Sequence, residues 1–328
     1  MRSALHHHFG EPADVLVHGE SPIPQPGPGE VRIRTRLAPI HNHDLWTIRG
    51  QYGYKPKLPA IGGSEGLGVI DAVGEGVEGL EGLTVGQRVT AASGRGTWAE
   101  YFVASASMVI PMPEAIEDEV AAQLIAMPLS ALMLLEFLKV EAGQWIVQNA
   151  ANGAVGKTLA MLAAARGIHV LSLVRRDAGV GEMTALGVDN VLSTEAPGWK
   201  DKAKALLGES LARAAVDSVG GQASADLLGL LGQEGVLVSF GAMSGEPMII
   251  PPGDMIFKHA TVTGFWGSKV SREMSAADKR RLVGELIQRA ISGELQLPVE
   301  AIFDLEHAAE AAAASLQPGR KGKVLLRP

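Results

Sequence analysis

A loop of small residues, between a short apolar run and a helical pattern, is the part of the sequence best suited to bind a phosphate group. The run Trp145 to Val147 is long enough for a buried strand, and Ala151, Gly153 and Gly156 follow it with the spacing AxGxxG. Apolar residues then recur at helical intervals between residues 155 and 166. A helix N-terminus has unpaired backbone N–H groups and a positive dipole end, which stabilise a pyrophosphate. Because a second strand pattern follows the helix, the arrangement predicts a dinucleotide-binding loop.

The residues that end the second strand pattern indicate which dinucleotide binds. NAD sites usually carry an acidic residue about twenty residues past the glycines, where it binds the ribose 2′-hydroxyl. Arg175 and Arg176 occupy this position, directly after the apolar run from His169 to Val174. Two charge-assisted hydrogen bonds of roughly 1.5–3 kcal/mol each would favour a 2′-phosphate by roughly a hundredfold or more. The alternative is a pair of solvated surface arginines; at this position we favour NADPH.

Length and composition describe an ordinary globular protein with room for two domains. The chain has 328 residues, of which 46% are apolar and 20% are charged, and a domain usually contains roughly 100–200 residues. The net charge of −7 and the lack of a basic tract argue against a nucleic-acid partner. The sequence has no cysteine, which excludes disulfides, thiolate zinc sites and a catalytic thiol.

No segment of the sequence is typical of membrane insertion or secretion. The most apolar stretch, residues 120–135, is interrupted by Gln123, Pro128 and Ser130. It is therefore shorter than the roughly 20 apolar residues that a membrane span needs. The N-terminus shows no signal peptide. We expect a cytoplasmic protein without a membrane partner.

Short strand patterns predict an all-β first domain over residues 1–118. Residues 31–37 alternate between apolar and polar side chains, as a half-buried strand does. Glycines separate the short strand patterns that follow, as in a small barrel: Gly74, Gly76, Gly79 and Gly82.

Helical and strand patterns alternate from residue 119 to residue 268, which indicates a parallel sheet with helices on both faces. The later strands of this second domain are expected at residues 215–219, 235–240 and 261–264. The remaining segment, residues 269–328, has a helical pattern from residue 276 to about 291. It ends in a strand at residues 323–327, which we expect to return to the first domain.

Several short motifs occur together along nearly the whole chain. They are Ala38-Pro-Ile-His-Asn-His-Asp44, Ile48-Arg-Gly-Gln-Tyr-Gly53, Leu58-Pro-Ala-Ile-Gly-Gly-Ser-Glu-Gly66, Gln148-Asn-Ala-Ala-Asn-Gly-Ala-Val-Gly156, Asp217-Ser-Val-Gly-Gly221, Phe240-Gly-Ala-Met243 and Gly264-Phe-Trp266. With them the chain resembles the medium-chain dehydrogenase/reductase superfamily, and within it the zinc-less quinone reductases and 2-enoyl thioester reductases, the mitochondrial type in particular. The resemblance implies an α/β fold in which a doubly wound parallel sheet, the Rossmann domain, accompanies a GroES-like β-barrel catalytic domain.

The zinc dehydrogenases of this superfamily place their catalytic metal on a Cys, on the His of a Gly-His-Glu motif and on a further residue downstream. The first two positions correspond to His41 and Ser64 here, and nothing obvious supplies the third. Serine is a poor ligand, and a catalytic zinc needs about three protein ligands. A metal on His41 and His43, which we expect to share one face of a strand-like segment, is the alternative. We predict no metal site.

Reduction of an enone or enoyl thioester puts negative charge on the carbonyl oxygen of the substrate once hydride reaches the β-carbon. A hydroxyl or N–H donor must stabilise this enolate or protonate its α-carbon. The resemblance to enoyl reductases assigns this role to the Tyr of their Gln-Gly-x-Tyr stretch, which matches Tyr52. The alternative role for Tyr52 is packing, with its hydroxyl in water.

The segment His41-Asn42-His43 departs from the family, whose members tend to carry Asn-Pro-Ser there. Two imidazoles at the floor of the expected pocket could protonate a substrate or hydrogen-bond its carbonyl. A structural pair bonded to loop backbone would explain them equally well. The candidate catalytic residues are therefore Tyr52, His43 and His41.

The resemblance also implies which residues contact NADPH. At the pyrophosphate we expect Asn152, Gly153, Ala154 and Val155, and around the adenosine phosphate Arg175, Arg176 and Asp177. The residues expected beside the nicotinamide half are Phe240, Gly241, Ala242, Met243, Phe265, Trp266 and Gly267. Lys323 matches a terminal-strand lysine that reaches NADPH in the family.

The function that follows is NADPH-dependent reduction of an activated C=C bond in a small enoyl thioester or enone. An NADPH:quinone oxidoreductase on the same scaffold is the alternative, and a non-catalytic NADPH-binding protein is a remoter one. The resemblance implies a homodimer formed through the edge of the nucleotide domain's sheet. The acyl chain length and the carrier, CoA or acyl-carrier protein, are left open.

Overall fold

The chain folds into two compact units. The structure is a computed structural model that describes residues 1–77, 83–92, 95–209 and 211–328, so the expected turn glycines Gly79 and Gly82 lie outside the described residues. Unit 1 comprises Met1–Ala126 and Leu297–Pro328, and unit 2 comprises Met127–Gln296. Both ends of the chain therefore belong to unit 1.

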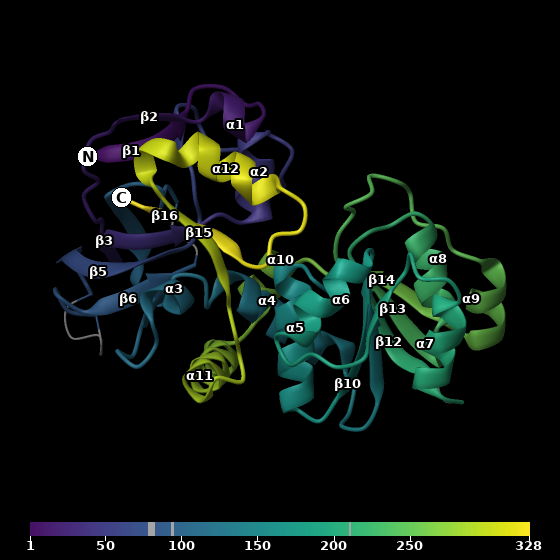
Figure 1. The fold of residues 1–328 in the computed structure, drawn as a ribbon. Helices are drawn as coiled ribbons and strands as arrows, with labels where there is room; N and C mark the ends of the chain where they lie inside the picture. Colours follow the sequence, from purple (N-terminus) through teal and green to yellow (C-terminus); the bar gives the residue numbers. More distant parts are fainter. Residues whose placement is uncertain (78–82, 93–94, 210) are drawn as a thin grey trace. The chain divides into compact units, whose positions relative to one another are not determined.

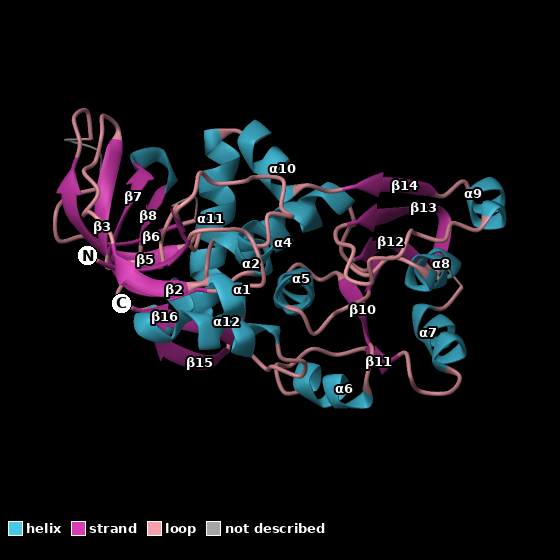
Figure 2. Ribbon diagram, turned by 90° about the horizontal axis from the view of Figure 1, so that it is seen from above, coloured by secondary structure: helices cyan, strands magenta, loops and turns pink. Residues whose placement is uncertain are grey.

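Unit 1 is built mainly of strands, which Figure 2 draws in magenta. Most of its strand pairs are antiparallel, and β15 and β16 are parallel. A three-stranded sheet has the order β2-β1-β4, and a seven-stranded sheet has the order β15-β16-β3-β5-β6-β8 with β7 paired to β3. The bounds are β1 Arg2–His6, β2 Val17–Glu20, β3 Glu30–Pro39, β4 Ala60–Ile61, β5 Gly66–Val73, β6 Arg88–Ala91, β7 Tyr101–Ser105, β8 Val109–Pro111, β15 Val299–Asp304 and β16 Lys323–Arg327.

The sequence pattern located two of these strands correctly. In β3, Val31 and Ile33 are fully buried while Arg34 is exposed, which is the alternation expected of a half-buried strand. The strand predicted at residues 323–327 is β16, and it pairs with the end of β3 through Leu325 and Leu326. The return of the C-terminus to the first part of the chain is thus confirmed.

Unit 1 also contains short helices, so its first 118 residues are not all β as the sequence pattern suggested. They are α1 Pro12–Val15, α2 Asn42–Ile48, the 3₁₀ helix η1 Ala106–Met108, α3 Asp118–Ala121, the 3₁₀ helix η2 Leu305–His307 and α12 Ala308–Leu316. Helix α2 corrects the prediction that His41 and His43 lie on a strand-like segment. His41 is the N-cap of α2, where the Asp44 carboxylate accepts its backbone N–H at 2.9 Å, and Leu45 and Ile48 anchor the helix in the core.

Unit 2 contains a six-stranded parallel sheet with the order β11-β10-β9-β12-β13-β14. The strands are β9 Trp145–Gln148, β10 His169–Val174, β11 Val191–Ser193, β12 Ala212–Asp217, β13 Leu231–Ser239 and β14 Thr261–Gly264. Numbered within the sheet this order is 3-2-1-4-5-6, the doubly wound arrangement that binds dinucleotides. The predicted Rossmann fold is therefore confirmed, and the strand expected at 215–219 begins and ends earlier, at 212 and 217.

Helices cover both faces of this sheet, with α5 and α6 on one face and α7 and α8 on the other (Figures 1 and 2). The helices of unit 2 are α4 Ala126–Leu138, α5 Ala154–Ala165, α6 Asp177–Thr184, α7 Trp199–Leu207, α8 Gln222–Gly229, α9 Pro252–Lys258, α10 Gly267–Glu273 and α11 Ala276–Ser292. The first residue of α4 is the last residue of unit 1. None of the helices in the described ranges combines the length and the hydropathy that a membrane span requires.

The segment predicted as residues 269–328 is divided between the two units. Ion pairs tie α11 to α4 and α5: Arg281 lies 3.2 Å from Glu136, and Arg166 lies 2.7 Å from both Glu136 and Glu285. These contacts hold residues 269–296 in unit 2, and only the residues from Leu297 onward belong to unit 1.

Candidate functional site

The loop between β9 and α5 has the close packing that its small residues predicted. A Cβ atom added to Gly156 would lie 2.5 Å from the carbonyl oxygen of Ala151, so only glycine fits there without a shift of backbone. Gly153 is the N-cap of α5, and Asn152 donates from Nδ2 to Glu182 Oε2 at 3.2 Å, which fixes the loop against α6. The first N–H groups of α5 have no acceptor within the helix. The loop therefore fits a diphosphate.

Arg175 and Arg176 follow β10, and both side chains are exposed. Neither guanidinium forms an ion pair or hydrogen bond with a described residue, whereas the Arg175 carbonyl accepts the Ser193 hydroxyl at 3.2 Å. The backbone of Arg175 is thus fixed by a hydrogen bond, while the two guanidinium groups stay free to bind a ligand. Asp177 begins α6, with Arg176 as its N-cap. These residues fit an extra phosphate next to the adenosine of a dinucleotide.

A buried polar network joins the loops that follow β9 and β12. Asn149 donates from Nδ2 to Asp217 Oδ1 at 2.7 Å, and its Oδ1 accepts the backbone N–H of Ser218 at 2.7 Å. Asp217 also accepts the N–H groups of Val219 and Gly220. The sequence motifs 148–156 and 217–221 contain these two residues, but no role was predicted for Asn149 or Asp217. Their positions at the ends of two neighbouring strands could have indicated one.

The aromatic residues expected beside the nicotinamide half come together at the ends of β13 and β14. The rings of Phe240 and Phe265 stack with centroids 5.9 Å apart, and Phe137 meets Phe265 edge-on at 5.4 Å. Met243 and Trp266 are 70% and 52% exposed, so their apolar side chains remain free to cover a ligand. A Cβ on Gly267 would lie 2.9 Å from the Ser130 hydroxyl.

In unit 1, His41 and Glu65 form a fully buried pair. His41 Nε2 lies 2.7 Å from Glu65 Oε2, and Glu65 Oε1 accepts the backbone N–H groups of Ile125 and Ala126 at 2.9 and 2.8 Å. The second ring nitrogen of His41, Nδ1, is buried without a hydrogen-bond partner among the described residues. His41 is therefore placed to support its neighbours rather than to contact a substrate.

Burial controls the charges of this pair. Burial, and next the positive charge of Lys323, hold the pKa of His41 well below its usual range, so the ring is neutral. Burial raises the pKa of Glu65 to about 7, although its two backbone donors act in the opposite direction. Burial and the nearby Arg320 charge lower the pKa of Lys323 to about 8. Lys323 thus loses its proton at a lower pH than an ordinary lysine, and Asp44 and Glu65 are the anions that favour its charged form.

His41, His43, Asp44, Ser64 and Glu65 form a polar cluster, and His43 lies on its more exposed side. Its ring stacks on His41 with centroids 5.1 Å apart, and its Nε2 lies 2.7 Å from the Ser64 hydroxyl, which donates to Asp44 at 2.6 Å. The half-buried ring of Tyr52 lies 5.7 Å from the His43 ring. The structure therefore brings together the three predicted catalytic residues, and Tyr52 and His43 are the two with exposed surface.

Three further residues of this cluster were missed as functional residues. Asp44 stands three positions after the N-cap His41, the spacing of a capping box, which was the signal for a helix start. Ser64 and Glu65 were considered only against a zinc-ligand pattern. No group of three or more His, Cys, Asp or Glu side chains in the described part of the chain is arranged to hold a metal ion.

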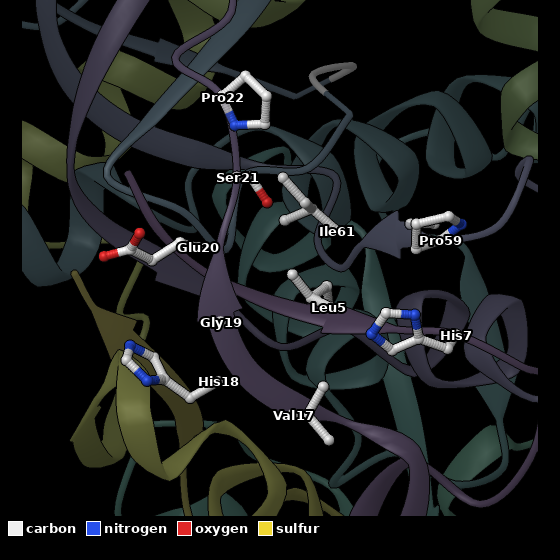
Figure 3. Close-up of a pocket in the computed structure, with 11 residues that line it drawn as sticks. Leu5, His7, Val17, His18, Gly19, Glu20, Ser21, Pro22, Pro59 and Ile61 are labelled. Carbon is white, nitrogen blue, oxygen red and sulfur yellow. The ribbon is translucent and has the colours of Figure 1, made fainter.

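A separate surface pocket of about 410 Å³ lies over the β2-β1-β4 sheet (Figure 3). His18 and Glu20 project from β2 at one side of it, and His7 lies at the other. None of the predicted site residues lines this pocket. This pocket is therefore distinct from the site formed by Tyr52, His43 and their neighbours.

Two protein families match the chain, one within each unit. Residues 27–114 match the alcohol dehydrogenase GroES-like domain, and residues 154–281 match the zinc-binding dehydrogenase family. The mitochondrial enoyl-acyl-carrier-protein reductase of Homo sapiens is 30% identical over 332 residues, which cover 99% of this chain and 88% of that protein.

Solved structures resemble the chain over its full length. A mycobacterial quinone oxidoreductase is 28% identical with a TM-score of 0.89, and a mycobacterial protein complexed with NADPH is 29% identical with a TM-score of 0.88. In both comparisons 100% of each chain is covered. The resemblance inferred from the motifs is confirmed: the chain belongs to the medium-chain dehydrogenase/reductase family of oxidoreductases.

Proposed function

We propose that this protein is an NADPH-dependent reductase of activated C=C bonds, acting on 2-enoyl thioesters or enones. The observation that carries the proposal is the Tyr52 phenol beside the anchored His43 imidazole, in a chain related to enoyl reductases over 99% of its length. When bound, NADPH supplies the hydride that adds to the β-carbon of the substrate. The rest of the chemistry is positioning of the substrate and handling of one proton.

The residues of unit 2 hold the cofactor in this proposal. Asn152, Gly153, Ala154 and Val155 bind the pyrophosphate at the start of α5, where N–H groups and the helix dipole favour negative charge. Arg175 and Arg176 bind the 2′-phosphate, and Asp177 lies next to the adenosine ribose. The nicotinamide half is assigned to Phe240, Gly241, Ala242, Met243, Phe265, Trp266 and Gly267, and Lys323 of unit 1 is assigned to NADPH as well.

Tyr52 stabilises the enolate that develops on the substrate carbonyl, or donates the proton that its α-carbon needs. His43 is the second group of the cluster with exposed surface, which makes it the candidate to exchange a proton with Tyr52 or with the substrate. His41 is buried against Glu65 and acts through the stacked His43 ring. The two histidines therefore have different roles.

Reduction of quinones is the second candidate function, and the likeness to a mycobacterial quinone oxidoreductase favours it. A non-catalytic NADPH-binding protein is the third. A homodimer and a cytoplasmic location remain predictions from the sequence.

Steady-state turnover of NADPH with three acceptors separates these functions: crotonyl-CoA, a small enone and a naphthoquinone. We expect the C=C acceptors to give the higher kcat/KM, with the saturated thioester or ketone as product. Turnover of the naphthoquinone alone would replace the proposal with the quinone reductase. Tight NADPH binding without turnover of any acceptor would replace it with the binding protein.

A further inference from the structure

Ser64 connects His43 to Asp44 by two short hydrogen bonds. The Ser64 hydroxyl donates to Asp44 Oδ1 at 2.6 Å and lies 2.7 Å from His43 Nε2. The other oxygen of Asp44 accepts the backbone N–H of His41 at 2.9 Å. Because this bond caps α2, the carboxylate is fixed to the backbone, and the Ser64 hydroxyl is fixed to the carboxylate.

The direction of each bond follows from the protons available. A carboxylate has none to donate, so the single proton of the Ser64 hydroxyl is committed to Asp44. His43 Nε2 must then donate its own N–H to a lone pair of Ser64 Oγ. Nε2 therefore keeps its proton whether the His43 ring is neutral or charged, and Nδ1 is the ring nitrogen that gains or loses one.

The surroundings of the ring leave Nδ1 available. No described residue forms a hydrogen bond with it, and the His43 side chain is 25% exposed. Asp44 lies 3.5 Å from Nε2, His41 stacks on one face, and Tyr52 lies 5.7 Å away between ring centroids. Glu65 and Lys323 are the other charged groups near the ring. Glu65 bonds the stacked His41 and interacts with His43 through its charge, and Lys323 is attracted to Asp44.

We propose that Asp44 and Ser64 are positioning residues that hold His43 in its Nε2–H tautomer, so that His43 carries protons through Nδ1 alone. The use made of that proton rests on the proposed function. With NADPH bound, hydride would bond to the β-carbon, the C=C electron pair would move onto the α-carbon and the carbonyl, and the Tyr52 hydroxyl would give its proton to the α-carbon. Charged His43 then gives its Nδ1 proton to the Tyr52 phenolate, and a solvent proton bonds to Nδ1 again.

The tautomer is measured directly by NMR of protein labelled with the heavy nitrogen isotope in its nine histidines, at a pH above the usual titration range of histidine. The His43→Gln variant identifies the His43 signals. We expect a protonated Nε2 and an unprotonated Nδ1 in the wild type and in Ser64→Thr, and a mixture of both tautomers in Ser64→Ala. A protonated Nδ1 in the wild type, or an unchanged tautomer in Ser64→Ala, would overturn the proposal.

Kinetics test whether the tautomer matters to catalysis. We expect Ser64→Ala to lower kcat for crotonyl-CoA by at least about tenfold with little change in KM, to increase the solvent deuterium isotope effect, and to be rescued by Ser64→Thr. Thr47→Val is the matched control. It removes from α2, the helix that carries His43, a hydroxyl whose hydrogen bond among the described residues is to the His43 carbonyl, at 2.7 Å. Wild-type kcat and pH profile in Ser64→Ala would contradict the role of His43 as proton carrier. A wild type that reduces none of the acceptors would refute the proposed function, and the NMR measurement would still decide the role of Ser64.

Discussion

The imidazole ring of His41 stacks on that of His43, with centroids 5.1 Å apart and planes inclined by 16°. The two rings nevertheless have different surroundings: His41 is fully buried against the Glu65 carboxylate, whereas His43 is partly exposed and bonds the neutral hydroxyl of Ser64. One ring is fixed as a neutral support, and the other faces the side where Tyr52 lies. Variants of Glu65 therefore test the surroundings of His41, and variants of Ser64 test those of His43.

Glu65→Gln should change how stability depends on pH. Burial raises the pKa of Glu65 from 4.5 to about 7, so the folded state retains a proton that the unfolded chain has already released. This contribution to stability is complete below about pH 4.5 and is lost as the pH rises through about 7. The free energy of unfolding of the wild type, relative to the variant, should therefore fall across this window by up to about 3 kcal/mol. The lowered pKa of His41 makes stability rise with pH instead, but this contribution is the same in the wild type and in Glu65→Gln.

Urea unfolding at several pH values measures this difference. Glutamine keeps an oxygen that can accept the N–H groups of Ile125 and Ala126, so the variant removes the titrating carboxyl while these two hydrogen bonds are kept. A wild-type-minus-variant difference that stays constant with pH would show that the carboxyl of Glu65 titrates normally in the folded protein.

The double variant Arg175→Ala/Arg176→Ala should lose its preference for NADPH. Each guanidinium contributes roughly 1.5–3 kcal/mol to binding of the 2′-phosphate, so the Kd for NADPH should rise by roughly a hundredfold or more while the Kd for NADH stays nearly unchanged. Fluorescence titration with both dinucleotides measures this. Arg280→Ala is the matched control, because Arg280 is also exposed in unit 2 and forms no ion pair with a described residue. Equal losses for NADPH and NADH would mean that the two arginines do not recognise the extra phosphate.

Gly156→Ala should destabilise the protein, because the new Cβ would lie 2.5 Å from a backbone oxygen and 2.7 Å from the Cα of Ala151. Overpacking of this kind costs about 1–3 kcal/mol, and the shift of the loop should also weaken NADPH binding. Gly284→Ala offers a contrast in the interior of α11, where a Cβ meets nothing within 4 Å. That variant should gain up to about 1 kcal/mol. Thermal unfolding compares the two, and equal Tm values would refute the packing account of Gly156.

The sequence predicted the parts of the structure that depend on local patterns. The run from Trp145 to Val174 contains a strand, a turn of small residues, a helix and a second strand. Apolar runs mark the strands, small residues mark the turn, and helical spacing of apolar residues marks the helix. The Rossmann sheet and the positions of Arg175 and Arg176 therefore followed from the sequence alone. Helix α2 did not, because its seven residues are too few to show a helical repeat and its start depends on the Asp44 carboxylate.

The polar cluster around His43 could not be predicted for a different reason. Ser64 and Glu65 are 21 and 24 residues from the histidines that they bond. Nothing in their local sequence indicates these partners, because the pairing is created when the loop before β5 packs next to α2. Ser64, read only as a failed zinc ligand, bonds both His43 and Asp44.

The central claim is that the Tyr52 phenol handles the charge and the proton of C=C reduction. Turnover of crotonyl-CoA by Tyr52→Phe tests it most directly, with the NADPH Kd measured on the same protein. The account predicts that kcat falls by roughly 10²–10³-fold, as for the loss of one donor to a developing oxyanion, while the NADPH Kd is unchanged. A Tyr52→Phe variant that reduces crotonyl-CoA at the wild-type rate would contradict it.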